Sequence, residues 1–422
     1  MAFLPLRRSG APAHVTPART ESREETTAPS GPARLCATGF VAYCSYAICR
    51  SPLLPLFARD LGAGPSLVGL VVGASTVTGI FLKMPAGALS DVLGRRPLLL
   101  AGSLVFALMP FTYLGASSLA ALIVLRFAHG SATAIFGPVA SATVSDLAPA
   151  AARGTWLSTY ATARGAGQAL GPVLAGYLIA AGRFDLAFVA AGVIGLAAPL
   201  ILGAWSPSVA AHATAARWPA FRAGILEVVR HRLILVTSAA HAGQFVLNGA
   251  LSAFLPIYGR DVVGLTTPQL GWHFAGQPVT TPAVRPLIGA TSDRVGRRGV
   301  IVAGLTVCSI AVWALPATTD AWMLATAVVT YAAGVATTTA ATSAFITDLS
   351  RRARYGTAHG VFGTIYDIGD AAGPIGAGVL VAAVGYAPMF RTLAVVGLTM
   401  AVVFAVASRP NLSPEAPHVA ES

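Results

Sequence analysis

The stretch GALSDVLGRR at residues 87–96 recurs as GATSDRVGRR at residues 289–298, an offset of 202 positions. Both copies set a glycine, an aspartate and two arginines against long apolar segments. Only 10% of the 422 residues are charged, so these charges are scarce. Their use in two copies of one short pattern indicates that the pattern has a structural or functional role.

The composition predicts a membrane protein. Hydrophobic residues make up 55% of the chain, and its charged fraction is far below the roughly 25% of an average soluble domain. Apolar runs of about 20 residues recur along the chain, and each is long enough to cross a hydrocarbon core of about 30 Å. We therefore expect an all-α, polytopic protein embedded in a lipid bilayer.

Apolar runs between polar breaks predict twelve spans in two sets of six. The expected organisation is a disordered cytoplasmic tail (1–34), a first six-helix bundle (35–204), a cytoplasmic linker (205–232), a second six-helix bundle (233–407) and a short cytoplasmic tail (408–422). The predicted spans are 36–58, 67–88, 97–115, 118–142, 155–181, 184–204, 233–258, 268–290, 299–316, 321–345, 357–384 and 387–407.

The arginines cluster in loops on one side of these spans, including Arg95, Arg153 and Arg297, whereas Arg59 and Arg183 lie on the other side. The positive-inside rule makes the richer side cytoplasmic, with both termini there, in the cell membrane. The net charge of +12 is carried in short loops, which argues against a nucleic-acid partner. The four cysteines lie in apolar segments without metal-ligand spacing, so no metal site or cofactor is expected.

The repeat extends beyond the first pattern. GQALGPVLAG at residues 167–176 matches GDAAGPIGAG at residues 369–378 at the same offset, without a gap. SDLAP at 145–149 likewise matches TDLSR at 347–351. Several matches at one offset indicate a duplicated six-helix unit, an arrangement found in secondary transporters.

From about residue 36 to 407 the chain resembles the major facilitator superfamily. Gly87, Leu89, Asp91, Gly94, Arg95 and Arg96 match the signature loop between helices 2 and 3 of that family, although Val92 stands where a basic residue is usual. The resemblance implies two pseudo-symmetric six-helix bundles, alternating access and a monomer. It also implies a cytoplasmic gate, for which the repeat suggests Gly87, Asp91, Gly94, Arg95, Arg96, Asp146, Gly289, Asp293, Gly296, Arg297, Arg298 and Asp348. The alternative is that these loops only set the topology.

The second repeated motif is rich in glycine, which lets helix backbones approach closely. In the first copy it resembles the antiporter motif of drug–proton exporters, with Ala175 where glycine is usual. Its presence in both halves leaves open whether it marks an exporter or serves packing alone. The motif comprises Gly167, Gly171, Pro172, Gly176, Gly369, Gly373, Pro374 and Gly378.

Charges within the spans are expensive unless they face a cavity or a partner. The first half contributes Arg50, Arg126 and Arg164, and the second contributes Asp367 and Asp370, so we expect the two sets to meet across a central cleft. Asp367 and Asp370 share one helix face, where repulsion and loss of water favour protonation of one of them. Together with Arg126, whose RFAHG context resembles the helix-4 motif linked to proton transfer, they are the predicted proton-coupling residues. The alternative is a static ion pair that holds the halves together.

Six polar residues are predicted to line the substrate cleft. Arg50 and Arg164 would favour an anionic or zwitterionic solute unless an aspartate neutralises them. His241, a second possible proton relay, is by the alternative interpretation a packing residue. Lys83, the chain's single lysine, is expected to snorkel to the interface. The predicted cleft residues are Arg50, Arg164, Gln168, His241, Gln244 and Asn248.

The predicted function is secondary transport of a small organic molecule by alternating access, coupled to protons. No Walker loop is present, so ATP is not the expected energy source, and the short loops carry no catalytic cluster of an enzyme. Export by antiport, of the multidrug type, is favoured because of the motif at residues 167–176. Proton-coupled uptake of an organic anion is the first alternative, and a non-transporting receptor on a transporter scaffold is another.

Overall fold

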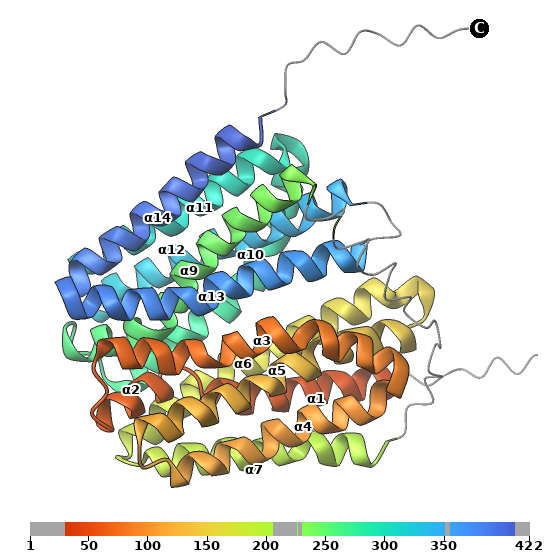
Figure 1. Ribbon diagram of the computed structural model, residues 1–422, viewed down its shortest axis with the longest axis horizontal. Coiled ribbons are helices and arrows are strands. Elements are labelled where there is room, and N and C mark those ends of the chain that lie inside the picture. The colour runs from red at the N-terminus through yellow and green to blue at the C-terminus, as the bar shows by residue number, and fades with distance from the viewer. Residues whose placement is uncertain (1–29, 206–225, 227–229, 351–354, 410–422) are drawn as a thin grey trace, which may run out of the picture.

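The computed structural model describes residues 30–205, 226, 230–350 and 355–409, and this part of the chain is helical without strands (Figure 1). Each predicted span corresponds to a long helix or, for the first span, to a pair of helices. The helices are α1 (Ser30–Ile48), α2 (Leu53–Asp60), α3 (Pro65–Leu93), α4 (Arg95–Thr112), α5 (Leu119–Leu147), α6 (Arg153–Ala180), α7 (Phe184–Gly203), α9 (Arg232–Asp261), α10 (Thr267–Val295), α11 (Arg297–Ala314), α12 (Ala321–Leu349), α13 (Tyr355–Val384) and α14 (Tyr386–Ala407).

The first span differs from its prediction at two points. Helix α1 begins at Ser30, inside the predicted tail, where Gly31 is buried against Trp205 and Leu147. The span is also interrupted, because α1 ends at Ile48 and α2 begins only at Leu53. Pro52 immediately precedes α2, and a proline cannot donate a helical hydrogen bond. The break therefore lies beside Arg50. The remaining residues of the predicted N-terminal tail lie outside the described part of the chain.

Helices α1–α7 form one bundle and α9–α14 form the other (Figure 1). Inside the first bundle α1 packs along α6, and inside the second α9 packs along α13. The main contacts between the bundles are α3 with α13 and α6 with α10. Because α3 corresponds to α10, and α6 to α13, at the offset of 202 residues, the two contacts are related by the pseudo-symmetry of the repeat.

Glycines at equivalent positions make the turns of the two halves. Gly94, between α3 and α4, has φ +87°, and Gly296, between α10 and α11, has φ +93°. Side chains with a Cβ rarely adopt this conformation, which explains the glycine in each GRR loop. We call the end of the molecule that holds these two turns the basic end. The opposite end holds Gly62 (φ +85°) and Gly264 (φ +79°). We call it the closed end, because the two halves are in tight contact there.

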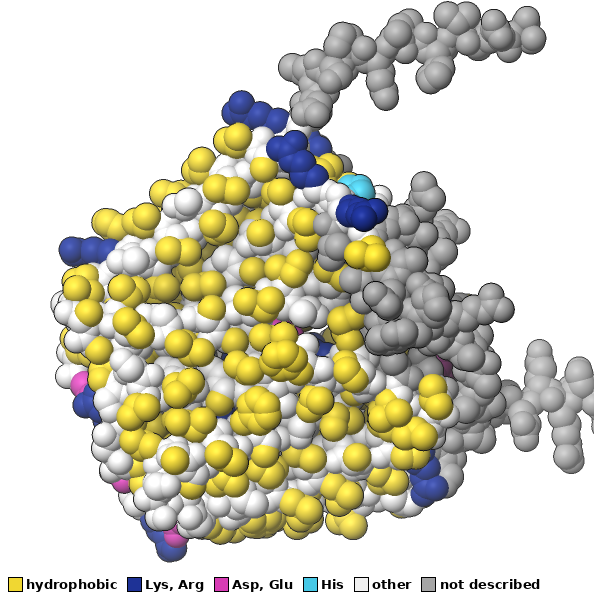
Figure 2. Space-filling model, in the orientation of Figure 1, with side chains coloured by type: hydrophobic (Ala, Val, Ile, Leu, Met, Phe, Trp, Pro, Cys, Tyr) yellow, Lys and Arg dark blue, Asp and Glu magenta, His cyan; other side chains and the backbone are white. Residues whose placement is uncertain are grey.

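The outer surface is apolar. Large hydrophobic side chains such as Val124, Leu200 and Ile310 are exposed, and Figure 2 shows such side chains spread over the visible face, with most charges at its edges. Ten stretches of the described chain are long and apolar enough to cross a membrane. Helices α6 and α10 are absent from that set although both are full-length, and they face each other across the central cavity.

Candidate transport site between the two halves

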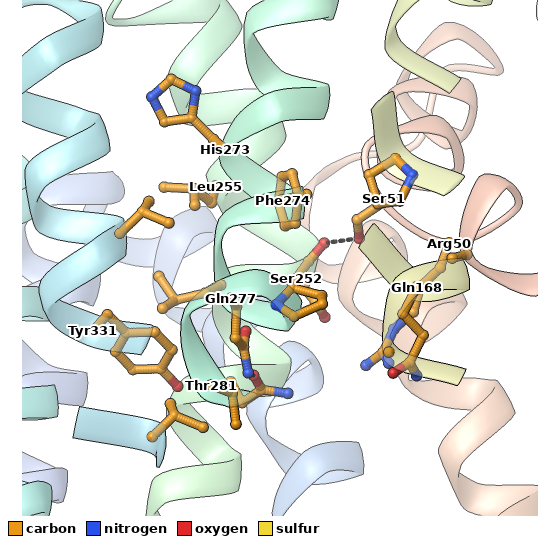
Figure 3. Close-up of a pocket in the computed structure, with 18 of the residues that line it drawn as sticks. Arg50, Ser51, Gln168, Ser252, Leu255, His273, Phe274, Gln277, Thr281 and Tyr331 are labelled. Atoms are coloured by element: carbon orange, nitrogen blue, oxygen red, sulfur yellow. Dashed lines mark hydrogen bonds between the residues drawn. The ribbon is translucent and has the colours of Figure 1, made fainter. Parts of the chain in front are cut away.

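A cavity of about 530 Å³ lies between the bundles (Figure 3). Arg50 and Gln168 of the first half face Gln277, Thr281 and Tyr331 of the second half across it. Its wall is mostly polar near these residues and apolar beyond them. The other lining residues come from α1, α6 and α9–α12 and include Tyr46, Ser158, Thr162, Arg164, Asn248, Leu251, Ser252, Leu255, His273, Phe274, Val328, Val335 and Thr339.

The halves are in tight contact at the closed end. A Cβ on Gly176 of α6 would collide with the backbone of Thr267 at the start of α10, and a Cβ on Gly378 of α13 would collide with that of Pro65 at the start of α3. Arg59 and Asp261 form an ion pair of 3.1 Å across the same end. The cavity is therefore sealed from this side.

One side of the cavity wall carries a hydrogen-bond network centred on Asp370, which is 8% exposed. Its carboxylate accepts hydrogen bonds from Arg50 (3.4 Å), Thr76 (3.1 Å) and Asn248 (3.1 Å). Asn248 in turn accepts one from Gln277 at 3.2 Å. The network joins the break between α1 and α2 to α3, α9, α10 and α13, so the cavity-lining Gln277 is linked to a buried acid through a single side chain.

Asp367 pairs with Lys83, which we had expected to lie at the membrane interface. Lys83 Nζ donates to Asp367 Oδ2 at 2.5 Å, and the two side chains are 35% and 6% exposed. The prediction that Lys83 snorkels to the interface is therefore wrong. The ammonium instead pairs with a carboxylate of the other half, and each charge is the partner that the other needs inside the bundle. The pair connects α3 to α13.

The arginines of the first half do not all meet the aspartates. Arg50 pairs with Asp370, which agrees with the alternative that an aspartate neutralises this arginine. Arg126 and Arg164 form no ion pair among the described residues. Arg126 is fully buried, donates to the Tyr46 hydroxyl at 3.3 Å and stacks on the same ring. Arg164 lines the cavity and stacks on Tyr43, with its guanidinium carbon 5.2 Å from the ring centre.

Four of the six predicted cleft residues line the cavity, namely Arg50, Arg164, Gln168 and Asn248. His241 does not, because it is buried among Phe245, Phe362 and Tyr366 and lies 3.3 Å from the Thr342 hydroxyl. Gln244 is also buried and donates to Tyr331 at 3.3 Å. Both residues share a helix with Asn248, but they point into the packing of the second half.

At the basic end the repeated motif forms two equivalent clusters. Arg95 donates to Asp146 at 3.1 Å and also to Ser90, while Arg297 donates to Asp348 and to Ser292, both at 3.1 Å. These four hydrogen bonds each join residues of one half, and they tie the turn after α3 or α10 to the end of α5 or α12. The backbone at the other gate positions follows the same helices and turns, whereas the side chains of Asp91 and Asp293 lie outside the described set.

The repeated glycines occupy equivalent helix contacts. A Cβ on Gly167 would collide with the Phe40 carbonyl of α1, and one on Gly369 would collide with the Ala242 carbonyl of α9. Gly171 and Gly373 likewise lie against α1 and α9. The prolines of both copies, Pro172 and Pro374, contact the opposite half, where a Cβ on Gly271 or Gly69 would collide with their carbonyls.

Sequence reasoning missed three residues of the site, namely Thr76, Gln277 and Tyr331. Thr76 and Gln277 bond to Asp370 and Asn248, and Tyr331 accepts from Gln244 at the cavity wall. In the sequence these three residues stand out only as uncharged polar side chains within apolar helices. The low hydropathy of α10, which leaves it outside the set of apolar spans, was the most direct indication.

The sequence model of the Major Facilitator Superfamily matches residues 35–275 and 263–421, which together span the helical part of the chain. The chain belongs to this superfamily. The two overlapping matches agree with the two bundles and their internal repeat. Members of the superfamily are transporters, so this multi-pass membrane protein is a transporter and not an enzyme.

Three individual proteins illustrate the similarity. An uncharacterized MFS-type transporter of Methanocaldococcus jannaschii is 22% identical over 84% of this chain and 92% of its own length. The multidrug resistance protein MdtH of Aeromonas hydrophila is 30% identical over 53% of this chain and 55% of its own length. The structure of a bacterial homologue of the human lysosomal transporter Spinster superimposes with a TM-score of 0.74 at 16% identity, covering 91% of this chain and 96% of that one.

Proposed function

We propose that the protein exports a small organic solute across the cell membrane in exchange for protons, acting as a monomer. The observation that carries the proposal is Asp370, a carboxylate near the centre of a membrane helix that receives three hydrogen bonds and lies one side chain away from the cavity. It is 14 or more residues from either end of α13, which corresponds to about 21 Å of helix.

Protonation of this carboxyl group would change the contact between the halves. An ionised Asp370 attracts the Arg50 guanidinium and accepts from Thr76, and both partners belong to the first half. A protonated Asp370 loses the charge attraction and one acceptor position. The α13 helix is then held less firmly to α3 and to the break between α1 and α2, so the halves can separate at this seam.

Asp367 would contribute to the same step through its pair with Lys83. The two carboxylates lie one helical turn apart, and their joint ionisation is disfavoured by repulsion in a medium with little water. Protonation of one therefore lowers the cost of keeping the other ionised. Arg126, predicted as a third proton-coupling residue, would act through Tyr46, which lines the cavity.

Three observations support the direction and orientation. The arginine-rich turns gather at the basic end, which the positive-inside rule assigns to the cytoplasm. The cavity is sealed at the opposite end, so a solute would enter from the cytoplasm in this conformation. The similarity to a multidrug resistance protein further supports export.

The test is solute movement in liposomes that contain the purified protein. Ethidium and fluorescein, which are fluorescent and opposite in charge, are offered with and without an imposed pH gradient. We expect gradient-dependent movement of at least one of them, and about a tenfold lower rate in Asp370→Asn. The control is Asp185→Asn, which removes an exposed carboxylate at the closed end and should leave the rate unchanged.

Two results would contradict the proposal. One is movement of the solute that is independent of the gradient. The other is gradient-dependent movement that is unaltered in both Asp367→Asn and Asp370→Asn. Binding of the probes without any movement would instead favour a receptor built on the transporter scaffold.

A further inference from the structure

The cavity holds a cation that nothing in the described protein neutralises. Arg164 of α6 lines the cavity and forms no ion pair among the described residues, and its Nε is buried without a hydrogen-bond acceptor. The guanidinium lies over the ring of Tyr43, which supplies no negative charge. The guanidinium therefore lacks a charge partner, which a group that enters the cavity would supply.

The charge balance around the cavity points in the same direction. Of the described residues that line it, Arg50 and Arg164 are the charged ones apart from the titratable His273, and both are cations. Asp370 pairs with Arg50, and Asp367 pairs with Lys83. Both buried aspartates are thus already engaged, and the buried Arg126 adds a further positive charge to the first half.

We propose that the cavity binds its solute through an anionic group of carboxylate or phosphate type, held by the Arg164 guanidinium. This inference rests on the proposed transport of a small organic solute and names the chemical class of that solute. A guanidinium binds the planar face of a carboxylate, or two oxygens of a phosphate, with paired hydrogen bonds. An unpaired cation inside a membrane is energetically unfavourable. An anionic solute would neutralise it, whereas a cationic solute would add to the repulsion.

The opposite wall suits the rest of such a solute. Gln277, Thr281 and Tyr331 present neutral hydrogen-bonding groups from the second half, and Figure 3 shows them facing the Arg50 and Gln168 side chains of the first half. Gln168 is one helical turn from Arg164, so the two lie on one face of α6. The anionic end would therefore be anchored to one half while the uncharged body contacts the other.

Four probes of nearly equal shape separate charge from size. Benzoate and phenylphosphonate carry an anionic group, benzamide is neutral and benzamidine is a cation. Dissociation constants are obtained from the dependence of the unfolding midpoint on probe concentration, with purified full-length protein in detergent at one fixed pH. We expect benzoate or phenylphosphonate to bind about tenfold more tightly than benzamide, the lower end of the range for hydrogen bonds to a charged group, and benzamidine to bind most weakly.

Variants assign this preference to one side chain. Arg164→Gln should make benzoate and benzamide bind equally, and Arg164→Lys should keep part of the preference. Arg183→Gln removes one positive charge at an exposed site outside the cavity and should leave the preference intact. The comparison of the four probes on the unaltered protein remains informative even if Arg164→Gln does not fold.

The inference is overturned if benzamidine binds as tightly as benzoate, if no anionic probe binds more tightly than benzamide, or if the preference survives in Arg164→Gln. The measurement uses no pH gradient and no movement of solute. Anion binding without proton coupling would therefore refute the proposed antiport and leave this inference standing. Proton-coupled movement without any preference for anions would refute this inference and leave the antiport standing.

Discussion

Lys83 Nζ lies 2.5 Å from Asp367 Oδ2 and so joins α3 of the first half to α13 of the second half. The pair lies on the α3–α13 seam, beside Gly79, where a Cβ would be 3.7 Å from the same carboxylate. In Figure 2 both charge colours show inside a hollow of the otherwise apolar face. Because of this ion pair, the stability of the α3–α13 contact depends on the charge of Asp367.

Removal of one partner of this pair should cost more than removal of both. Lys83→Met leaves Asp367 unpaired, and we expect a loss of about 2 kcal/mol, less than the 3–5 kcal/mol of a fully buried pair because the lysine side chain is 35% exposed. Lys83→Met with Asp367→Leu should recover most of that loss. The measurement is the unfolding midpoint in detergent. Additive effects of the two substitutions would contradict the pairing.

Glycine positions on α13 provide a matched test of helix packing. Gly369→Ala would drive a methyl group into the Ala242 carbonyl of α9, whereas Gly376→Ala meets nothing within 4 Å. We expect the first change to destabilise the protein by about 1–3 kcal/mol, the usual cost of overpacking, and the second to be neutral or slightly stabilising. Equal unfolding midpoints for the two variants would mean that α9 and α13 do not approach so closely.

Much of the fold could be predicted from the sequence because hydropathy and duplication are properties of whole segments. The two bundles follow from apolar runs and from matches such as Gly167 with Gly369. The break between α1 and α2 was not located, because the apolar run continues across it as one span. The predicted spans 155–181 and 268–290 correspond to the long helices α6 and α10, which the ten apolar stretches do not include.

The site was predicted only in part because an apolar helix does not reveal which face points inward. His241, Gln244 and Asn248 recur at helical spacing, yet only Asn248 reaches the cavity. The charges of the two halves do meet, as expected, but the partners are Arg50 and Lys83 and not Arg126 or Arg164. Which cation reaches an acid depends on the rotation of each helix by a few tens of degrees, and single-sequence periodicity does not fix that rotation.

The link between cavity and acid predicts an effect of Asn248. Asn248→Ala removes the side chain that donates to Asp370 and accepts from Gln277, so solute binding and protonation should become less tightly coupled. We expect about a tenfold loss of pH-gradient-driven solute movement in liposomes, with a smaller loss of equilibrium benzoate binding because Asn248 also lines the cavity. A tenfold change corresponds to about 1.4 kcal/mol, within the range for a hydrogen bond to a charged group.

The matched control for this variant is Gln168→Ala. Gln168 lines the cavity from the first half, and no hydrogen bond joins it to Asp370 among the described residues. Its loss should weaken solute binding without altering the dependence of movement on the pH gradient. A variant of Asn248 that behaves like the variant of Gln168 would show that the network does not carry the coupling.

The seal at the closed end predicts that a covalent link there stops transport. Arg59 of α2 and Asp261 of α9 lie in opposite halves, 3.1 Å apart at their charged atoms. In Arg59→Cys with Asp261→Cys, a short reducible cross-linker should hold this end shut. The four native cysteines are buried and should react slowly. If the halves must separate here in each cycle, solute movement in liposomes should fall to background and return after reduction.

The control places the same cross-linker within one half. Arg183→Cys with Asp185→Cys joins exposed neighbours at the start of α7, and solute movement should be unaffected. The uncross-linked double variant at Arg59 and Asp261 should also transport, because exposed ion pairs contribute about 0–1 kcal/mol. Undiminished transport by the cross-linked protein would mean that the closed end stays shut throughout the cycle, and the cavity would then have to empty through the basic end in both directions.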